Sequence, residues 1–138
     1  MDIQEINRTV IEQFRAGGPI EGMHRERLVL LTTTGARTGQ QRTTPLMFHA
    51  DGDRLLVIAS NIGAPKHPDW YVNLAADPRV GVEMDSEFGV ERYDALASTA
   101  EGAERDRLWS MLKQEYPFFA EHEQQTDREI PVVILARA

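Results

Sequence analysis

The stretch TGARTGQQRTTPLMF, residues 34–48, carries the residue types that bind anions. It contains two glycines, four threonines and two arginines, and no aspartate or glutamate. Glycine permits unusual backbone angles, and an arginine guanidinium pairs with phosphate or carboxylate through two parallel hydrogen bonds. The stretch lacks the spacing of a Walker loop or of a dinucleotide-binding fingerprint. It therefore predicts either an anion-binding loop or a solvated hairpin with surface arginines, and the residue types alone favour the hairpin.

The distribution of charge favours a small anionic ligand over nucleic acid. The chain has 138 residues and a formal net charge of −7, which argues against a general nucleic-acid-binding surface. Residues 27–50 nevertheless contain three arginines and no acid, and residues 54–68 contain Arg54 and Lys66 and no acid. An acidic protein that keeps one cationic region free of acids can attract a small anion to that region.

A second candidate segment is ASNIGAPKHP, residues 59–68, which leads from the end of an expected strand to the start of an expected helix. A helix N-terminus with cations nearby attracts anions, and Lys66 and His67 would supply charge or hydrogen bonds there. A plain strand-to-helix connection explains the segment equally well. Trp70 and Tyr71, which follow, fit a core-facing helix surface better than a stacking site for a cofactor.

Several other kinds of site fit the sequence poorly. There is no cysteine, which excludes disulfides, thiolate metal sites and cysteine nucleophiles. Ser60 lacks the G-x-S-x-G elbow of many hydrolases. No metal-ligand spacing occurs among the histidines, so we expect no metal and interpret them as surface or loop residues: His24, His49, His67 and His122. One aromatic group suits core packing better than an apolar pocket: Trp109, Tyr116, Phe118 and Phe119.

The hydrophobic pattern predicts the elements that must position these residues. Helices are expected over residues 3–15 and 100–115, and from Pro68 to a stop at Asp77-Pro78. Aliphatic and β-branched runs predict strands at residues 28–33, 42–50, 54–60, 80–84, 90–97 and 130–135, with Asp51-Gly52 as a hairpin signal. About six mostly antiparallel strands with peripheral helices indicate an α+β fold built on a small barrel.

Three motifs in order resemble one known family: LLTTTGARTGQQRTTPL, then ASNIGAPKHPDWYVNLAADPRVGVEM, then EYPFF followed by TDREIPVVIL. They resemble the deazaflavin-dependent nitroreductase family of actinobacteria over nearly the whole chain from Leu28 onward. The resemblance implies a split β-barrel like that of flavin mononucleotide (FMN)-binding oxidases, here one domain over residues 1–138 with an N-terminal helix and loop over residues 1–26. It also implies the coenzyme F420, whose tail of phosphodiester, lactate and glutamates is strongly anionic.

The resemblance also assigns roles to individual residues. It implies that the tail is held by Arg37, Thr38, Gln40 and Arg42, and that the ring system lies along Thr44, Pro45 and Met47. The rest of the implied cofactor cleft is Ala59, Ser60, Asn61, Gly63, Lys66, Trp70, Tyr71 and Asn73. The implied catalytic residues are Ser60 and Tyr116, and the implied substrate pocket includes Phe119 and His122.

The sequence departs from the family pattern at a few of these positions. Ala36 and Asn61 stand where some relatives carry basic residues, so the resemblance implies a weaker hold on the tail. Phe119 and His122 replace tyrosines found in the prodrug-activating members, which implies a more apolar pocket.

The expected function is transfer of a hydride from reduced F420 to an electrophilic acceptor, namely an activated alkene, a quinone or a nitroaromatic. Two alternatives remain open from the sequence: an FMN-dependent oxidase on the same barrel, and a non-catalytic F420 carrier. We expect a cytoplasmic protein with at most weak membrane association, because residues 1–15 have no basic excess. A homodimer is a further expectation, and the N-terminal helix is expected to act as a lid or to pack over the substrate pocket.

Overall fold

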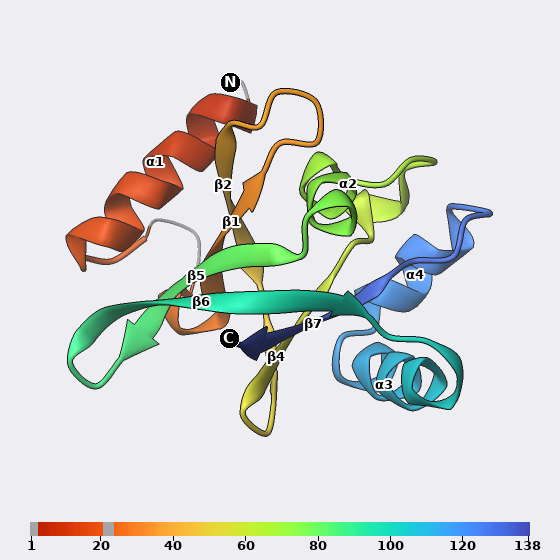
Figure 1. Ribbon diagram of the computed structural model, residues 1–138. Coiled ribbons are helices and arrows are strands. Elements are labelled where there is room, and N and C mark those ends of the chain that lie inside the picture. The colour runs from red at the N-terminus through yellow and green to blue at the C-terminus, as the bar shows by residue number, and fades with distance from the viewer. Residues whose placement is uncertain (1–2, 21–23) are drawn as a thin grey trace.

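The computed structural model describes residues 3–20 and 24–138, and the chain begins with helix α1, Ile3–Ala16 (Figure 1). Val10 and Phe14 of α1 are buried against Leu28 and Leu30, because apolar residues three and four positions apart share one helix face. The helix ends at Ala16 and is followed by Gly17, which has a φ of 80° and donates its N–H to the carbonyl of Phe14. The predicted helix over residues 3–15 is therefore confirmed.

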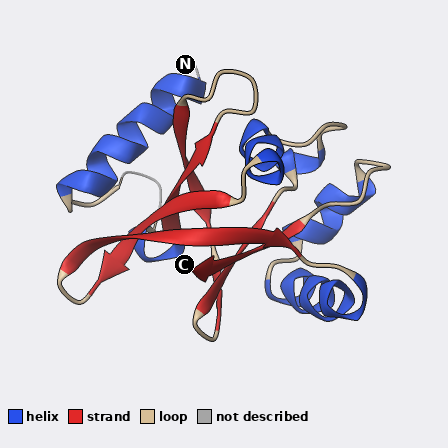
Figure 2. Cartoon of the chain, in the orientation of Figure 1, coloured by secondary structure: helices blue, strands red, loops and turns tan. Residues whose placement is uncertain are grey.

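Seven strands form one antiparallel sheet in the described part of the chain (Figure 2). Their order across the sheet is β2-β1-β5-β6-β7-β4-β3. Their bounds are β1 Leu28–Thr34, β2 Gln41–Met47, β3 His49–Asp51, β4 Arg54–Ile58, β5 Arg79–Ser86, β6 Gly89–Thr99 and β7 Val132–Arg137. The predicted α+β class is confirmed, and the prediction of about six strands is one too few for these residues.

The extra strand arises because the expected strand at residues 42–50 is divided at Phe48. Before this residue β2 pairs with β1, and after it β3 pairs with β4. Phe48 itself donates its N–H to the carbonyl of Arg27 and packs its ring against the core. The two edges of the sheet are thus consecutive in the chain, and the sheet curls into a barrel that brings them together.

The expected Asp51-Gly52 turn lies one residue further along the chain. Asp51 still pairs with Arg54, so Gly52 and Asp53 are the two loop residues of the β3–β4 hairpin. Gly52 has a φ of 64°, a left-handed conformation that glycine adopts without a steric penalty.

One apolar cluster fills the interior of the barrel. Trp70 and Leu74 of helix α2, Asp69–Ala76, join it from one end of the barrel. The strand residues in this cluster are Val29, Leu31, Leu55, Val57, Val80, Val82, Ala95, Ala97, Val133 and Leu135. The alternation along each strand sends these side chains inward and their neighbours outward.

A second apolar cluster covers the outer face of β4 and β7. Helices α3, Gly102–Glu115, and α4, Phe118–Gln124, pack there, on the side of the barrel opposite α1 (Figure 1). Leu108, Leu112 and Phe119 contact Leu56 and Ile134, the outward-facing neighbours of the interior residues. Coverage on both faces explains why β4 is almost wholly apolar. The aromatic segment at Phe118-Phe119 proves to be the first turn of α4.

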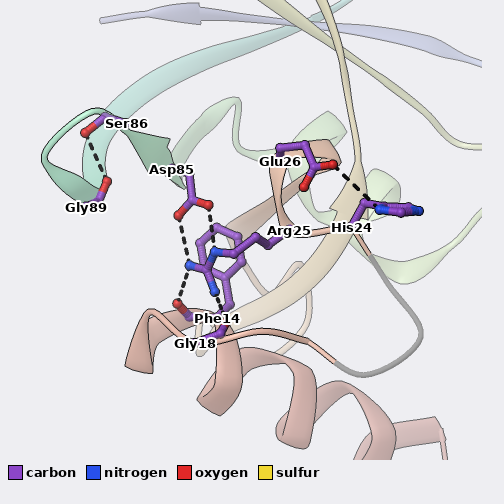
Figure 3. A network of polar contacts seen from close by, with 8 residues as sticks. All are labelled: Phe14, Gly18, His24, Arg25, Glu26, Asp85, Ser86 and Gly89. Atoms are coloured by element: carbon purple, nitrogen blue, oxygen red, sulfur yellow. Dashed lines mark hydrogen bonds and ion pairs between the residues drawn. The ribbon is translucent and has the colours of Figure 1, made fainter.

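Two arginines attach the N-terminal helix to β5. Arg15 donates two hydrogen bonds of 2.9 Å to the buried carboxylate of Glu83. Arg25, of the short 3₁₀ helix Arg25–Arg27, bonds Asp85 at 2.6 and 2.8 Å and donates to the carbonyls of Phe14 and Gly18 (Figure 3). The hydrogen bonds from Arg25 lower the pKa of Asp85, and Arg25 also satisfies carbonyls at the end of α1.

None of the described helices combines the length and the apolarity needed to cross a membrane. The single-domain reading of residues 1–138 stays a prediction.

Candidate functional site

The loop between β1 and β2, residues 35–40, is held in shape by its own backbone. Gly35 donates its N–H to the carbonyl of Gln40 at 2.8 Å, and Gly39 donates its N–H to the carbonyl of Gly35 at 2.9 Å. A Cβ on Gly35 would lie 2.9 Å from Thr38 Oγ1 and 3.1 Å from the carbonyl oxygen of Gln40, so a side chain there would force the loop to shift. Gly39 has a φ of 70°. The two glycines therefore permit a tight loop whose tip, Ala36 to Gln40, is exposed.

Asn73 of helix α2 holds this loop in place through its side-chain amide. Its side-chain oxygen accepts the N–H of Ala36 at 3.0 Å, and its side-chain nitrogen donates to Thr33 Oγ1 at 3.2 Å. Asn73 is buried, and both ends of its amide are engaged within the protein. The predicted cofactor residue Asn73 is thus placed to position the loop.

Arg37 and Arg42 are exposed on and just after this loop, and neither forms an ion pair with any residue that the structure describes. The same holds for Lys66, which is exposed shortly before α2. Arg15 and Arg25, in contrast, are each paired with a carboxylate. Exposed cations without acidic partners keep their capacity to bind an anionic ligand.

The second candidate segment, residues 59–67, is organised around Arg128, which stands shortly before β7. The Arg128 guanidinium donates to the carbonyls of Ala59 at 3.1 Å, Ser60 at 2.7 Å and Ala64 at 3.0 Å. It also donates to His67 Nδ1 at 3.0 Å. Because arginine can only donate, His67 Nδ1 is the unprotonated ring nitrogen. Burial and the neighbouring charge of Arg128 lower the pKa of His67, and burial lowers the pKa of Arg128.

The backbone turns left-handed within this segment. Three consecutive residues have positive φ: Asn61 at 49°, Ile62 at 56° and Gly63 at 80°. A β-branched residue is rarely found in this region, and Ile62 is also 74% exposed. A Cβ on Gly63 would lie 2.8 Å from Gln125 Cβ and 2.9 Å from the carbonyl of His122, so α4 packs directly on the turn. Such local strain is often found at functional sites.

A hollow of about 180 Å³ lies between β2, the end of β4 and α4. Its lining is apolar except for Ser60 and His122, whose Oγ and Nδ1 atoms are 3.2 Å apart. The apolar lining residues are Leu46, Met47, Ile58, Phe118 and Phe119. Four residues predicted separately as parts of the site therefore meet here: Met47, Ser60, Phe119 and His122.

Tyr116 stands behind this lining. Its ring contacts those of Phe118 and Phe119, with centroids 6.0 and 5.9 Å away, and its hydroxyl lies 2.9 Å from His49 Nδ1. Tyr116 is not part of the lining of the hollow itself. The structure thus brings the predicted catalytic residue Tyr116 close to the pocket without exposing it there.

Other predicted cofactor residues fall into two groups. Thr44 and Pro45 are half-buried on β2, between the cationic loop and the hollow, and Ala59 is buried at the end of β4. Trp70 is 7% exposed and belongs to the core inside the barrel, while Tyr71 bonds Thr99 Oγ1 at 2.9 Å. These contacts give Trp70 and Tyr71 a packing role, and their contact with a cofactor stays a prediction.

Two polar residues near the site were not predicted from the sequence. Arg128 and His49 were not selected, because each acts through partners more than 60 residues away in the chain. Of the histidines interpreted as surface or loop residues, His49 and His122 are half-buried, on β3 and α4. The one sequence signal that pointed to Arg128 was the segment TDREIPVV, in which an arginine precedes a buried strand.

A larger hollow, of about 580 Å³, lies at the β5–β6 hairpin, lined by Ser86, Glu87, Phe88, Val90 and Glu91. None of the predicted site residues lines it, and Phe88 beside it is 96% exposed. None of its polar lining residues is buried, whereas Ser60 at the smaller hollow is, so we place the candidate site at the smaller hollow.

The model of the F420H2-dependent quinone reductase family matches residues 6–137. An F420H2-dependent quinone reductase of Mycobacterium tuberculosis (strain H37Rv) is 38% identical over 112 residues, which cover 79% of this chain and 72% of the relative.

Solved structures agree with this result. A structure described as the F420-H2 dependent reductase FDR-A is 41% identical, with a TM-score of 0.68 over 83% of this chain and 99% of that one. Another, described as a domain-swapped dimer, is 38% identical, with a TM-score of 0.70 over 93% and 94% of the two chains. The heme storage protein HutZ of Vibrio cholerae, 18% identical with a TM-score of 0.60, shares the fold alone. The predicted split β-barrel is thereby confirmed.

Proposed function

Because the chain belongs to the F420H2-dependent quinone reductase family, we propose that it uses reduced F420 to reduce a quinone. One observation supports the proposal most directly. Strand β2 begins beside the exposed Arg37, carries the exposed Arg42, and ends at Leu46 and Met47, which line the apolar hollow. A single strand thus joins a place for an anionic tail to a place for a flat apolar molecule.

The donor chemistry of the loop fits the anionic tail of F420. Arg37, Arg42 and Lys66 have no acidic partner among the described residues, so binding an anion breaks no existing ion pair. Gly35 and Gly39 keep the loop tight, which leaves its tip free to approach a ligand closely. In this proposal the tail is held by Arg37, Thr38, Gln40, Arg42 and Lys66.

The ring of the cofactor would lie between β2 and the turn after β4. Thr44, Pro45 and Met47 would contact it from the strand, and Ala59, Ser60, Asn61 and Gly63 from the turn. When bound, reduced F420 supplies a hydride to the acceptor. The contribution of the protein is to orient the two molecules and to supply hydrogen-bond donors where negative charge develops.

The hollow suits the acceptor. A quinone is flat and apolar with carbonyl oxygens at its edge, which matches aromatic walls and one polar end. Phe118 and Phe119 would contact the ring faces, while Ser60 would donate its hydroxyl hydrogen to a carbonyl oxygen. His122 Nδ1, 3.2 Å from Ser60 Oγ, would hold that hydroxyl in position and exchange protons with it. Tyr116 would keep the aromatic wall in place.

Activated alkenes and nitroaromatics are electrophilic acceptors that the same polar end would accommodate. We favour quinones because the hollow has only two polar lining residues, Ser60 and His122, and these lie next to each other at one place in the lining. We also propose a cytoplasmic location with at most weak membrane contact, in line with the balanced charges of α1. A homodimer is proposed from the likeness to a structure described as a domain-swapped dimer.

Two measurements test the proposed function. The first is titration of the purified protein with F420 and with FMN; tighter binding of FMN would overturn the cofactor assignment. The second follows oxidation of reduced F420 with quinones, enones and nitroaromatics, each compared with a reaction lacking protein. We expect the highest kcat/KM with quinones. Intact F420 binding without turnover of any acceptor would instead indicate a carrier.

A further inference from the structure

The Arg128 guanidinium binds only backbone carbonyls and one neutral imidazole. It donates to Ala59, Ser60, Ala64 and His67, and it forms no ion pair with any acid in the described part of the chain. Arg128 is half-buried, and its guanidinium has exchanged water for these uncharged partners without gaining a carboxylate. The positive charge of Arg128 therefore acts on the residue 59–64 turn without being neutralised.

The orientation of these carbonyls determines where the next N–H groups point. In a trans peptide unit the C=O and the N–H point in opposite directions. The carbonyls of Ala59 and Ser60 point toward Arg128, so the N–H groups of Ser60 and Asn61 point away from it. Neither N–H donates a hydrogen bond to any described residue, although the N–H groups of the flanking Ala59 and Gly63 both do.

The backbone conformation brings these two N–H groups together. Ser60 is right-handed, with φ −74° and ψ −30°, and Asn61 is left-handed, with φ 49°. This succession directs adjacent N–H groups into one concave site that binds a negatively charged or partly negative atom. The hydroxyl of Ser60 lies on the same residue and at the lining of the apolar hollow.

We propose that Arg128 is a positioning residue that turns residues 60–61 into a binding site for a carbonyl oxygen, formed by two backbone N–H groups. The inference rests on the proposed function for the identity of the ligand, which is a carbonyl oxygen of the F420 ring or of the quinone. Arg128 does not touch the ligand; it fixes the two peptide units and adds positive charge behind them. The left-handed Asn61 and Ile62 are the conformational cost of that arrangement.

Three variants separate this role from simple stabilisation. Arg128→Met removes the charge and all four hydrogen bonds. Arg128→Lys keeps the charge but loses the planar set of N–H donors that reaches several carbonyls at once. We therefore expect its effect on the site to lie between those of the wild type and Arg128→Met. Arg105→Met is the control for general loss of stability, because Arg105 bonds the carbonyl of Ile130 at 2.7 Å and pairs with Glu129 at 2.8 Å but contacts no residue of the 59–67 segment through a hydrogen bond.

The direct measurement is the amide proton shift of Ser60 and Asn61 by NMR, in titrations with oxidised F420 alone and with menadione added. We expect both signals to move downfield in the wild type and in Arg105→Met. Movement with F420 alone assigns the oxygen to the cofactor, and Arg128→Met then weakens F420 binding about tenfold. Movement only with menadione assigns it to the acceptor, and Arg128→Met then lowers kcat at least about tenfold.

Other results would overturn the inference. One is that neither amide moves although other signals of the site report binding. Another is that Arg128→Met and Arg105→Met lose the same free energy of unfolding and keep the same F420 affinity and kcat. If Arg128→Met does not fold, Arg128→Lys replaces it in this comparison. Should the wild type move these amides with F420 but reduce no quinone, the proposed function fails and the carbonyl-oxygen site stands.

Discussion

His49 Nδ1 lies 2.9 Å from the hydroxyl oxygen of Tyr116, and the two rings meet edge to face at 83°. The contact joins β3 to the residue that follows α3, across 67 positions of the chain. It also places Tyr116 against Phe118 and Phe119. The geometry of the aromatic wall therefore depends on a hydrogen bond outside the hollow.

We expect Tyr116→Phe to lower the free energy of unfolding by about 1 kcal/mol, because a half-buried imidazole loses its partner while the ring contacts remain. His49→Asn should cost a similar amount, and the double variant should cost less than the sum. Urea unfolding of the four proteins gives the coupling energy. Purely additive effects would show that the observed bond contributes nothing to stability.

The exposed cations should control the affinity for F420. We expect Arg37→Ala and Arg42→Ala each to weaken F420 binding roughly fivefold at low salt, an effect of about 1 kcal/mol for a solvent-exposed charge contact. The difference should shrink as salt is added, since charges are screened. Fluorescence titration at two ionic strengths measures both effects.

Arg107→Ala is the control for that experiment, because Arg107 is exposed on α3 and its loss changes the net charge equally. An equal loss of affinity in Arg107→Ala would mean that net charge, and not the loop, determines binding.

Ser60 should affect turnover more than cofactor binding. Ser60→Ala removes the hydroxyl at the polar end of the hollow but leaves the backbone, so we expect kcat with a quinone to fall roughly ten- to a hundredfold. The dissociation constant of F420 should change little. Stopped-flow oxidation of reduced F420 by menadione measures the first quantity and titration the second. A reduced affinity with unchanged kcat would place Ser60 at the cofactor alone.

The lowered pKa of His67 predicts that the stability of the protein depends on pH. Burial and Arg128 lower its pKa in the folded protein, so between the folded and the ordinary value near 6.5 the unfolded chain binds more protons. The stabilising contribution is therefore present above the ordinary pKa and is lost as pH falls through this interval. His67→Gln should flatten that part of the stability curve, measured by urea unfolding between pH 4.5 and 7.5 at intervals of about half a unit. An unchanged slope would count against the perturbed histidine.

Most of the fold follows from local signals in the sequence. The amphipathic spacing of α1, the aliphatic run of β1 and the proline at the start of α2 each predicted an element that the structure contains. The division at Phe48 could not be predicted, because the apolar pattern continues through it and only pairing with two different partners separates β2 from β3. Local pattern does not encode strand partners.

The site was predictable to a similar degree. Met47, Ser60, Phe119 and His122 were selected from motifs, and they meet at one hollow. The role of Arg128 could not be predicted from the sequence, because three of its four hydrogen bonds go to backbone carbonyl oxygens, which every residue type has. Trp70 shows the opposite case, since its residue type suits a core and a ligand site equally well and its burial is a tertiary property.

The division of one strand at Phe48 has a consequence for how this protein can change in length. The residues just before Phe48 line the hollow, and the residue just after it bonds Tyr116. An insertion or deletion of one residue here would turn every side chain of β2 or β3 to the opposite face of the sheet. The hairpin loop between β5 and β6 carries no such constraint. Length variation among relatives should therefore accumulate in the β5–β6 loop, while the spacing from Gln41 to Asp51 stays constant.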